Sequence, residues 1–186
     1  MSISDRIFPI FTLVFFALCI SWFSCTEAEY SLDNPFDPEN LNLDSPALFF
    51  HQPRISTTLW SDVDVEIYGL NIDSTAAAYI ELEFDWDRLR MNHITPGPFF
   101  DGENSPIMLV DSLMPSKPNI YIFYLPDMES EQSGGGTLQL AKISFTTIND
   151  VGGCSLKFGS NTELRDKNNQ QIILNDFGLG YIYAVE

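Results

Sequence analysis

The chain has 186 residues, and its 26 Asp and Glu against 9 Lys and Arg give a formal net charge of −17. Nucleic acid and anionic lipid surfaces bind clustered basic side chains, so this composition argues against both as partners. With 45% hydrophobic and 19% charged residues, the chain is too apolar to be disordered throughout. Its length suits one hydrophobic core.

The first 24 residues predict an export signal. A short polar start containing Arg6 precedes an apolar run over 7–23, which is short for a membrane-spanning helix and suits the core of a signal peptide. The run ends at Ser24-Cys25, which resembles the lipobox of bacterial lipoproteins and implies lipidation of Cys25. Trp22 departs from that pattern, so simple cleavage and an uncleaved anchor stay open. Each of these outcomes predicts an exported protein, either a membrane-anchored lipoprotein or an extracellular one.

Residues 25–45 predict a tether between the N-terminal segment and a domain. The stretch 26–45 holds six acidic residues and no basic one, with prolines at Pro35 and Pro38. Like charges repel and proline disfavours helix, so the segment is expected to be extended. Its carboxylates could also be read as calcium ligands, but they lack the spacing and the central glycine of an EF-hand loop.

Residues 46–186 are expected to form one all-β domain. Several segments alternate apolar and polar residues or combine β-branched and aromatic residues, and turn residues such as Gly152-Gly153 separate them. The expected strands are 62–68, 78–85, 106–111, 119–125, 138–148, 154–158 and 180–186. No sustained helical period occurs between them. The pattern predicts a two-sheet antiparallel β-sandwich with jelly-roll topology and about nine strands.

The residue types that carry catalysis are sparse in this domain. Cys154 is its single cysteine and is expected to be a small buried residue. His51 and His93 have no second nitrogen or thiolate ligand at metal spacing, and no glycine-framed serine is present. Asp85 is expected to accept backbone N–H bonds after its strand. We therefore expect no enzymatic activity, no resident metal and no cofactor. The phenylalanines expected to fill the core are Phe99, Phe100, Phe145 and Phe158.

The order of these local patterns resembles a cohesin domain, the module that captures dockerins in cellulose-degrading assemblies. The resemblance rests on the aromatic-Asp step Phe84-Asp85 after a strand, the turn in ITPGPFFDGEN (94–104), the glycine-rich strand entry GGGTLQLAKISF (134–145), and the polar hairpin LRDKNNQQI before the closing strand LGYIYAV. It covers the whole domain. It departs from the usual setting, because a single copy follows a lipobox-like segment.

The resemblance implies a partner-binding sheet face. In cohesins, the sheet of the third, fifth, sixth and eighth strands faces the dockerin, and here these strands are 78–85, 106–111, 119–125 and 154–158. With Ile80, Leu82 and Phe84 directed inward, the residues expected to point outward are Tyr79, Glu81 and Glu83. Tyr121 and Phe123 join them if Ile120 and Ile122 are inward, although a slip of one residue would invert this assignment. Exposed aromatics beside carboxylates suit a partner helix that carries Lys or Arg.

The resemblance thus implies a non-catalytic module, at the cell surface or secreted, that captures dockerin-bearing proteins linked to polysaccharide degradation. Calcium would then come mainly with the partner, whose paired loops fold when loaded. Two alternatives remain open at the level of sequence. One is a carbohydrate-binding module with an aromatic platform of Trp60, Trp86 and Tyr121. The other is a structural or adhesive surface lipoprotein without a dockerin partner.

Overall fold

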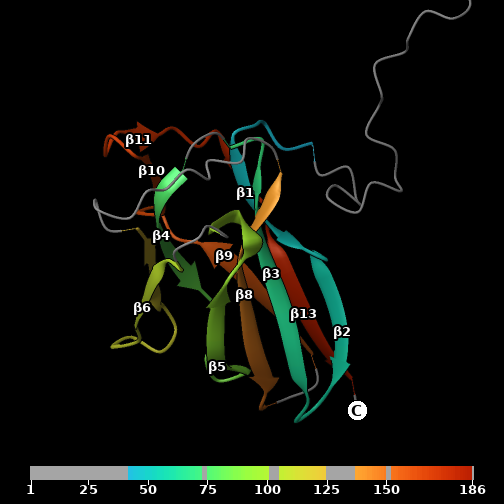
Figure 1. Ribbon diagram of the computed structural model, residues 1–186. Helices are drawn as coiled ribbons and strands as arrows, with labels where there is room; N and C mark the ends of the chain where they lie inside the picture. The colour runs from blue at the N-terminus through green and yellow to red at the C-terminus, as the bar shows by residue number, and fades with distance from the viewer. Residues whose placement is uncertain (1–41, 73–74, 101–104, 125–136, 150–151, 186) are drawn as a thin grey trace, which may run out of the picture.

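The computed structural model describes residues 42–72, 75–100, 105–124, 137–149 and 152–185. These residues form thirteen strands and one short 3-10 helix, η1 (Pro98–Phe100) (Figure 1). The strands are β1 (Ala47–His51), β2 (Arg54–Thr58), β3 (Asp62–Leu70), β4 (Thr75–Glu83), β5 (Leu89–Pro96), β6 (Ile107–Asp111), β7 (Asn119–Phe123), β8 (Leu138–Thr147), β9 (Gly152–Phe158), β10 (Glu163–Asp166), β11 (Gln171–Ile172), β12 (Asp176–Phe177) and β13 (Gly180–Val185). The predicted export signal, Cys25 and most of the predicted tether lie outside the described residues.

The strands form two sheets. The smaller sheet has the order β12-β1-β3-β8-β5, and Figure 1 shows β3, β8 and β5 side by side. The larger sheet has the order β11-β10-β4-β9-β13-β2, with β7 paired to β4 and β6 paired to β7. The chain passes from β3 in the small sheet to β4 in the large one, back to β5, and across again to β6. Repeated crossing between two sheets is the arrangement of a jelly roll.

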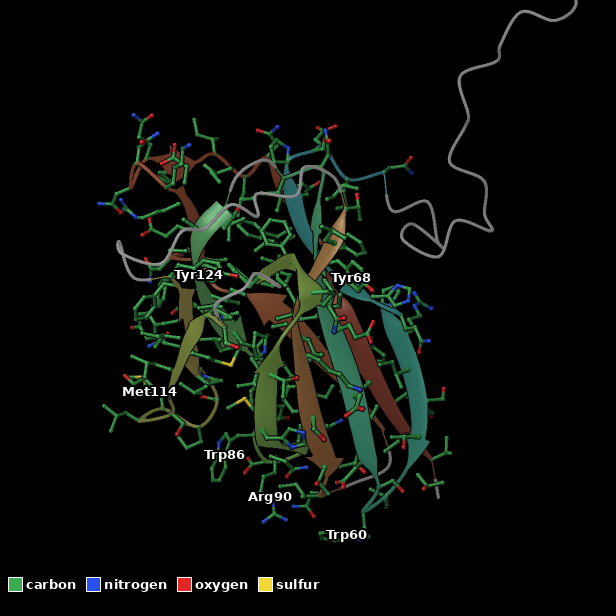
Figure 2. The ribbon with its side chains drawn as sticks, in the orientation of Figure 1. Trp60, Tyr68, Trp86, Arg90, Met114 and Tyr124 are labelled. Carbon is green, nitrogen blue, oxygen red and sulfur yellow. The ribbon has the colours of Figure 1, made fainter. Side chains whose placement is uncertain are left out.

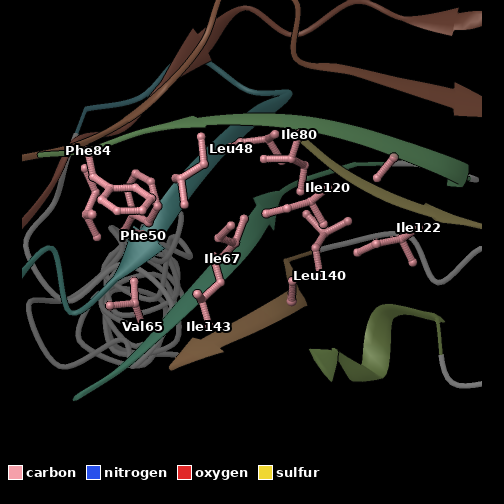
Figure 3. Close-up of a cluster of buried hydrophobic side chains, with 14 of the residues drawn as sticks. Leu48, Phe50, Val65, Ile67, Ile80, Phe84, Ile120, Ile122, Leu140 and Ile143 are labelled. Atoms are coloured by element: carbon pink, nitrogen blue, oxygen red, sulfur yellow. The ribbon is translucent and has the colours of Figure 1, made fainter. Parts of the chain in front are cut away.

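The core lies between the two sheets. Along β4, Ala78, Ile80 and Leu82 are buried at every second position, so one face of the strand enters the core. Figure 3 shows Ile80, Ile120 and Ile122 of the large sheet facing side chains of the small sheet. The facing side chains labelled there are Leu48, Phe50, Val65, Ile67, Leu140 and Ile143. Burial of this apolar surface supplies the main favourable free energy of folding.

The prediction of an all-β, two-sheet sandwich is confirmed, but the expected total of about nine strands is wrong. Six of the thirteen strands were not among the strands expected from the sequence. These are β1, β2, β5, β10, β11 and β12. The segment 47–51 is buried along its whole apolar stretch and shows no alternation, whereas β11 and β12 have only two residues each. The sheets are also not purely antiparallel, because β1 pairs with β12 and β2 with β13 in parallel.

Several local predictions are confirmed, and one is wrong. Cys154 is buried, and burial raises the pKa of its thiol. Asp85 accepts a hydrogen bond from the backbone N–H of Asp87 at 3.0 Å, as expected for the turn after β4. Phe99, Phe100 and Phe145 are buried, and Phe158 packs against the core while partly exposed. Gly152 and Gly153 do not form a turn, because they begin β9 and pair with β13.

Gly153 has a packing reason to lack a side chain. A Cβ atom at this position would lie 1.6 Å from the hydroxyl oxygen of Tyr181, so the tyrosine ring rests across β9.

Among the described residues, no helix has the length and hydropathy of a membrane-spanning segment.

The alternation along β4 predicts a large difference between two leucine substitutions. Leu82 is fully buried, and we expect Leu82→Ala to lower the free energy of unfolding by about 3 kcal/mol, since it removes apolar contacts and leaves a cavity. Leu109 on β6 is 55% exposed, so Leu109→Ala should cost less than about 1 kcal/mol. Urea denaturation of both variants measures this. Equal losses would contradict the assignment of inward and outward faces.

Candidate partner-binding face

The four strand regions expected to carry the partner-binding surface lie in one sheet. β6 pairs with β7, β7 pairs with β4, and the end of β4 pairs with β9. Along β4, the residues between the buried positions are Tyr79, Glu81 and Glu83, which are directed away from the core. On β7, Ile120 and Ile122 are fully buried, so Tyr121 and Phe123 are on the outward side. The register therefore brings all five predicted residues to one face of the sheet.

Residues that lie opposite one another form rows across the outward side of this sheet. The central row runs from Leu109 through Tyr121 and Tyr79 to Glu163. The rows on either side contain Ile107, Phe123, Ala77 and Arg165, and Asp111, Asn119 and Glu81. We refer to the outward residues of these three rows, together with Glu83, as the tyrosine face. It combines an aromatic centre with a border of carboxylates.

Two tyrosines with tilted, contacting rings form the centre of the tyrosine face. The ring centroids of Tyr79 and Tyr121 are 5.0 Å apart, with an interplanar angle of 33°. The hydroxyl of Tyr79 donates a hydrogen bond to Oδ1 of Asn119 at 3.1 Å. Burial raises the pKa of Tyr79, and the neighbouring Tyr121 and Glu81 raise it further. Tyr121 remains 37% exposed, so it presents ring surface that a partner could cover.

Glu81 is held in place by the loop between β9 and β10. Its Oε2 accepts hydrogen bonds from the backbone N–H of Asn161 at 3.3 Å and from Nδ2 of the same residue at 3.2 Å. The side chain crosses Gly159, where a Cβ atom would lie only 2.2 Å from Oε2. The carboxylate therefore has a fixed position, which lowers the entropic cost of using it in recognition.

Two further carboxylates on this face are paired within the chain. Glu83 forms an ion pair with Lys117, and this hydrogen-bonded contact raises the pKa of Lys117. Oε1 of Glu163 lies 2.9 Å from Nε of Arg165 on the same strand. The Glu83–Lys117 pair is largely solvent-exposed and the Glu163–Arg165 pair is partly exposed, so each contributes little to stability. A basic partner could exchange with Lys117 or Arg165 at low cost.

The structure adds apolar residues that the sequence analysis did not select. Leu109 continues the central row at the edge strand β6, and Val110 beside it is also exposed. In the β6–β7 connection, Leu113 is 90% exposed and Met114 is 66% exposed. Exposed apolar side chains grouped in this way are typical of interaction sites. The available signal was the run Ile-Met-Leu-Val over 107–110, which has no polar alternation and so leaves apolar residues on both sides of an edge strand.

The three aromatics proposed as a sugar-binding platform are not brought together. Trp60 lies in the turn between β2 and β3, Trp86 follows β4, and Tyr121 packs on Tyr79. Figure 2 shows Trp60 and Trp86 at separate places on the molecule. The groove that Trp86 lines contains neither of the other two residues. A shared platform of these side chains is therefore excluded.

The described part of the chain contains no group of three or more His, Cys, Asp or Glu side chains arranged to hold a metal ion. His51 on β1 lies against Tyr68, with ring centroids 5.2 Å apart. His93 lies on β5, which is separated from β1 by β3 and β8 in the small sheet. Lipidation of Cys25 concerns a residue outside the described ranges.

Comparison with solved structures identifies the fold as that of cohesin domains. The chain is similar to a type II cohesin domain from the cellulosome of Acetivibrio cellulolyticus, with a TM-score of 0.62 and 14% identity over 73% of this chain and 94% of that one. It is similar to a non-cellulosomal cohesin from the archaeon Archaeoglobus fulgidus, with a TM-score of 0.60 and 13% identity over 75% and 91% of the two chains. It also matches a type I cohesin–dockerin complex from Clostridium thermocellum, with a TM-score of 0.58 and 12% identity over 77% and 97%.

No protein-family model matches the sequence, and no curated protein matches it. At identities of 12–14%, the structural similarity establishes the fold. The predicted resemblance to cohesins is confirmed at that level, and the jelly-roll sandwich follows from it.

The surroundings of Tyr79 predict how this residue titrates in the folded protein. Because burial and the neighbours disfavour ionisation of Tyr79 in the folded protein, the fold has its full stability below the ordinary tyrosine pKa and loses part of it as the pH rises through the raised one. We expect Tyr121→Phe to lower the pKa of Tyr79 only partway, since burial, the largest cause, remains. Ring-carbon NMR during an alkaline titration measures this. Tyr183→Phe on β13 is the matched control and should leave the pKa of Tyr79 unchanged. An unchanged Tyr79 pKa in Tyr121→Phe would mean that the hydroxyl of Tyr121 does not influence Tyr79.

Proposed function

We propose that the domain captures a dockerin-like protein module on the tyrosine face. The proposal rests on one observation: a chain with the cohesin fold carries an aromatic and acidic surface on the sheet that contains β4, β6, β7 and β9. The four strands β6, β7, β4 and β9 lie in one sheet, and their outward side presents the contacting rings of Tyr79 and Tyr121 beside carboxylates. A cohesin with this fold forms the complex with a dockerin described above. The proposal extends that partner class to this chain.

The chemistry of the face defines what the partner must offer. Its centre would cover Tyr121 and Leu109 with apolar side chains, because large rings and aliphatic side chains supply most of the binding energy at protein interfaces. Its border would place Lys or Arg opposite Glu81 and Glu83. A net charge of −17 would accelerate association with such a partner and make the rate fall with salt. Leu113 and Met114 extend the apolar contact beyond the sheet.

The proposed role is binding without catalysis, in a protein whose predicted parts are an export signal (1–24), an acidic tether (25–45) and the cohesin-like domain (46–186). Lipidation at Cys25 would anchor the chain to a membrane, and the tether would hold the domain away from it. An association with polysaccharide degradation belongs to the same proposal. Calcium would enter with the partner, whose loops require it to fold.

A pull-down tests the partner class. The bait is residues 42–186, which contain every described strand and Ser45, whose carbonyl accepts a hydrogen bond from Asn175 at 2.6 Å. The prey is the secreted and envelope protein of the source cells, with and without a calcium chelator. A prey that carries paired calcium-loop repeats and is lost with the chelator supports the proposal. Capture of no such protein would contradict it and favour a structural or adhesive surface role.

Substitutions on the tyrosine face should separate binding from stability. We expect Tyr121→Ala to weaken capture of the partner by roughly ten-fold or more, because it removes the exposed ring at the centre of the face. Glu81→Gln should also weaken capture, and it keeps an acceptor for Asn161. Calorimetric titration measures affinity, and thermal unfolding measures stability.

Tyr183→Ala is the matched control, since Tyr183 is a similarly exposed tyrosine on β13 of the same sheet. It should leave affinity unchanged. Loss of affinity and stability in equal measure for Tyr121→Ala would place that ring in a structural role and remove it from the proposed site.

A further inference from the structure

A second concave surface lies at the open edge of the sandwich, away from the tyrosine face. It is a groove of about 760 Å³ between β5 and the β6–β7 hairpin. Its apolar floor includes Phe84 and Leu89, both buried in the core. Val110 and Ser112 line it from the side of the hairpin. The groove is open to solvent and wide enough for a ring-sized ligand.

The charge of this groove is opposite to that of the chain as a whole. Its lining contains Arg90 and His93 and no Asp or Glu, although acidic residues outnumber basic ones by 26 to 9 in the sequence. Within the described residues, Arg90 forms no ion pair. A guanidinium has five donors in a planar fork that matches a carboxylate. The groove therefore favours a ligand that carries a carboxylate.

An exposed indole borders the same groove. Trp86 is 54% exposed, and Figure 2 shows it in the same lower part of the molecule as Arg90, below Met114. An exposed tryptophan offers a flat apolar surface with a polar edge. A ligand that uses both residues needs one apolar face to stack on the indole and an acidic group at its rim.

We propose that this groove binds an acidic sugar unit of a polysaccharide, with the pyranose ring on Trp86 and its carboxylate on Arg90. A sugar ring has a face of C–H groups that packs on an aromatic ring and an edge of hydroxyls. The hydroxyl of Ser112 and the imidazole of His93 line the groove and supply hydrogen-bonding groups for that edge. Asp and Glu of an acidic peptide also satisfy Arg90, but they carry no ring to cover the indole, whereas one acidic sugar unit supplies both groups.

This site is independent of the proposed partner-binding function. None of the residues of the tyrosine face lines the groove. The two surfaces adjoin at the β6–β7 connection, where Ser112 lines the groove and Leu113 and Met114 extend the partner contact. Substitutions at Trp86 and Arg90 therefore test the groove, and those at Tyr121 and Glu81 test the tyrosine face.

Calorimetric titration of the full chain in detergent micelles, with a calcium chelator present, tests the proposal. The probes are trigalacturonate and its methyl ester, in which a methyl group on each carboxyl group removes the negative charge and leaves the sugar rings unchanged. The variants are Trp86→Ala and Arg90→Gln. Their matched controls are Trp60→Ala, at the other exposed tryptophan, and Arg54→Gln, at an exposed arginine on β2.

We expect trigalacturonate to bind, and Arg90→Gln to weaken that binding by roughly ten-fold while leaving the weaker binding of the methyl ester unchanged. Trp86→Ala should weaken both, and both control variants should match the parent. Three results would overturn the proposal. The first is no binding of trigalacturonate at millimolar concentration. The second is an equal loss in Arg54→Gln, which would indicate unspecific attraction. The third is Arg90-dependent binding of a tri-aspartate peptide with equal affinity, which would assign the groove to an acidic protein segment.

Discussion

The burial of Ile80 and Leu82 on β4 is the constraint on which the rest of the surface depends. Both side chains are fully buried between the sheets. Because side chains on a strand alternate, this burial directs Tyr79, Glu81 and Glu83 outward, and a slip of one residue would place carboxylates in the core. β4 also pairs with β7, β9 and β10, so its register sets which residues of those strands share the outward side. The ring contact between Tyr79 and Tyr121 is a consequence of that pairing.

Much of the fold could be predicted from sequence, because its central strands alternate clearly. The segments around Val65 on β3 and Ile80 on β4 alternate apolar and polar residues, and their burial follows that pattern. Strands without alternation could not be found in this way. The segment Ala47–His51 is apolar throughout, and β11 and β12 are defined only by a partner strand. The Gly152-Gly153 pair was predicted to be a turn. The neighbouring sequence gives no sign that the ring of Tyr181 occupies the space above Gly153.

Part of the candidate site could also be predicted from the alternation of side chains along its strands. The alternation of side chains along β4 and β7 selected five residues that the structure places on one face. It could not show which other residues border that face. Leu113 and Met114 lie in a loop, where period-two reasoning gives no direction, and Leu109 is exposed because β6 ends the sheet. The dispersal of Trp60, Trp86 and Tyr121 also depends on connections between strands. In each case the tertiary structure, and not the local sequence pattern, determines where the side chain lies.

The central claim is that the tyrosine face is where a protein partner binds. Amide and methyl chemical-shift mapping of residues 42–186, titrated with the calcium-loaded module recovered by capture, tests this claim most directly. The account predicts that the perturbed signals cluster on β4, β6 and β7 around Tyr79, Tyr121 and Leu109 and extend to Leu113 and Met114. Perturbations confined to the outward side of the small sheet, around Glu66 and Lys142, would contradict it.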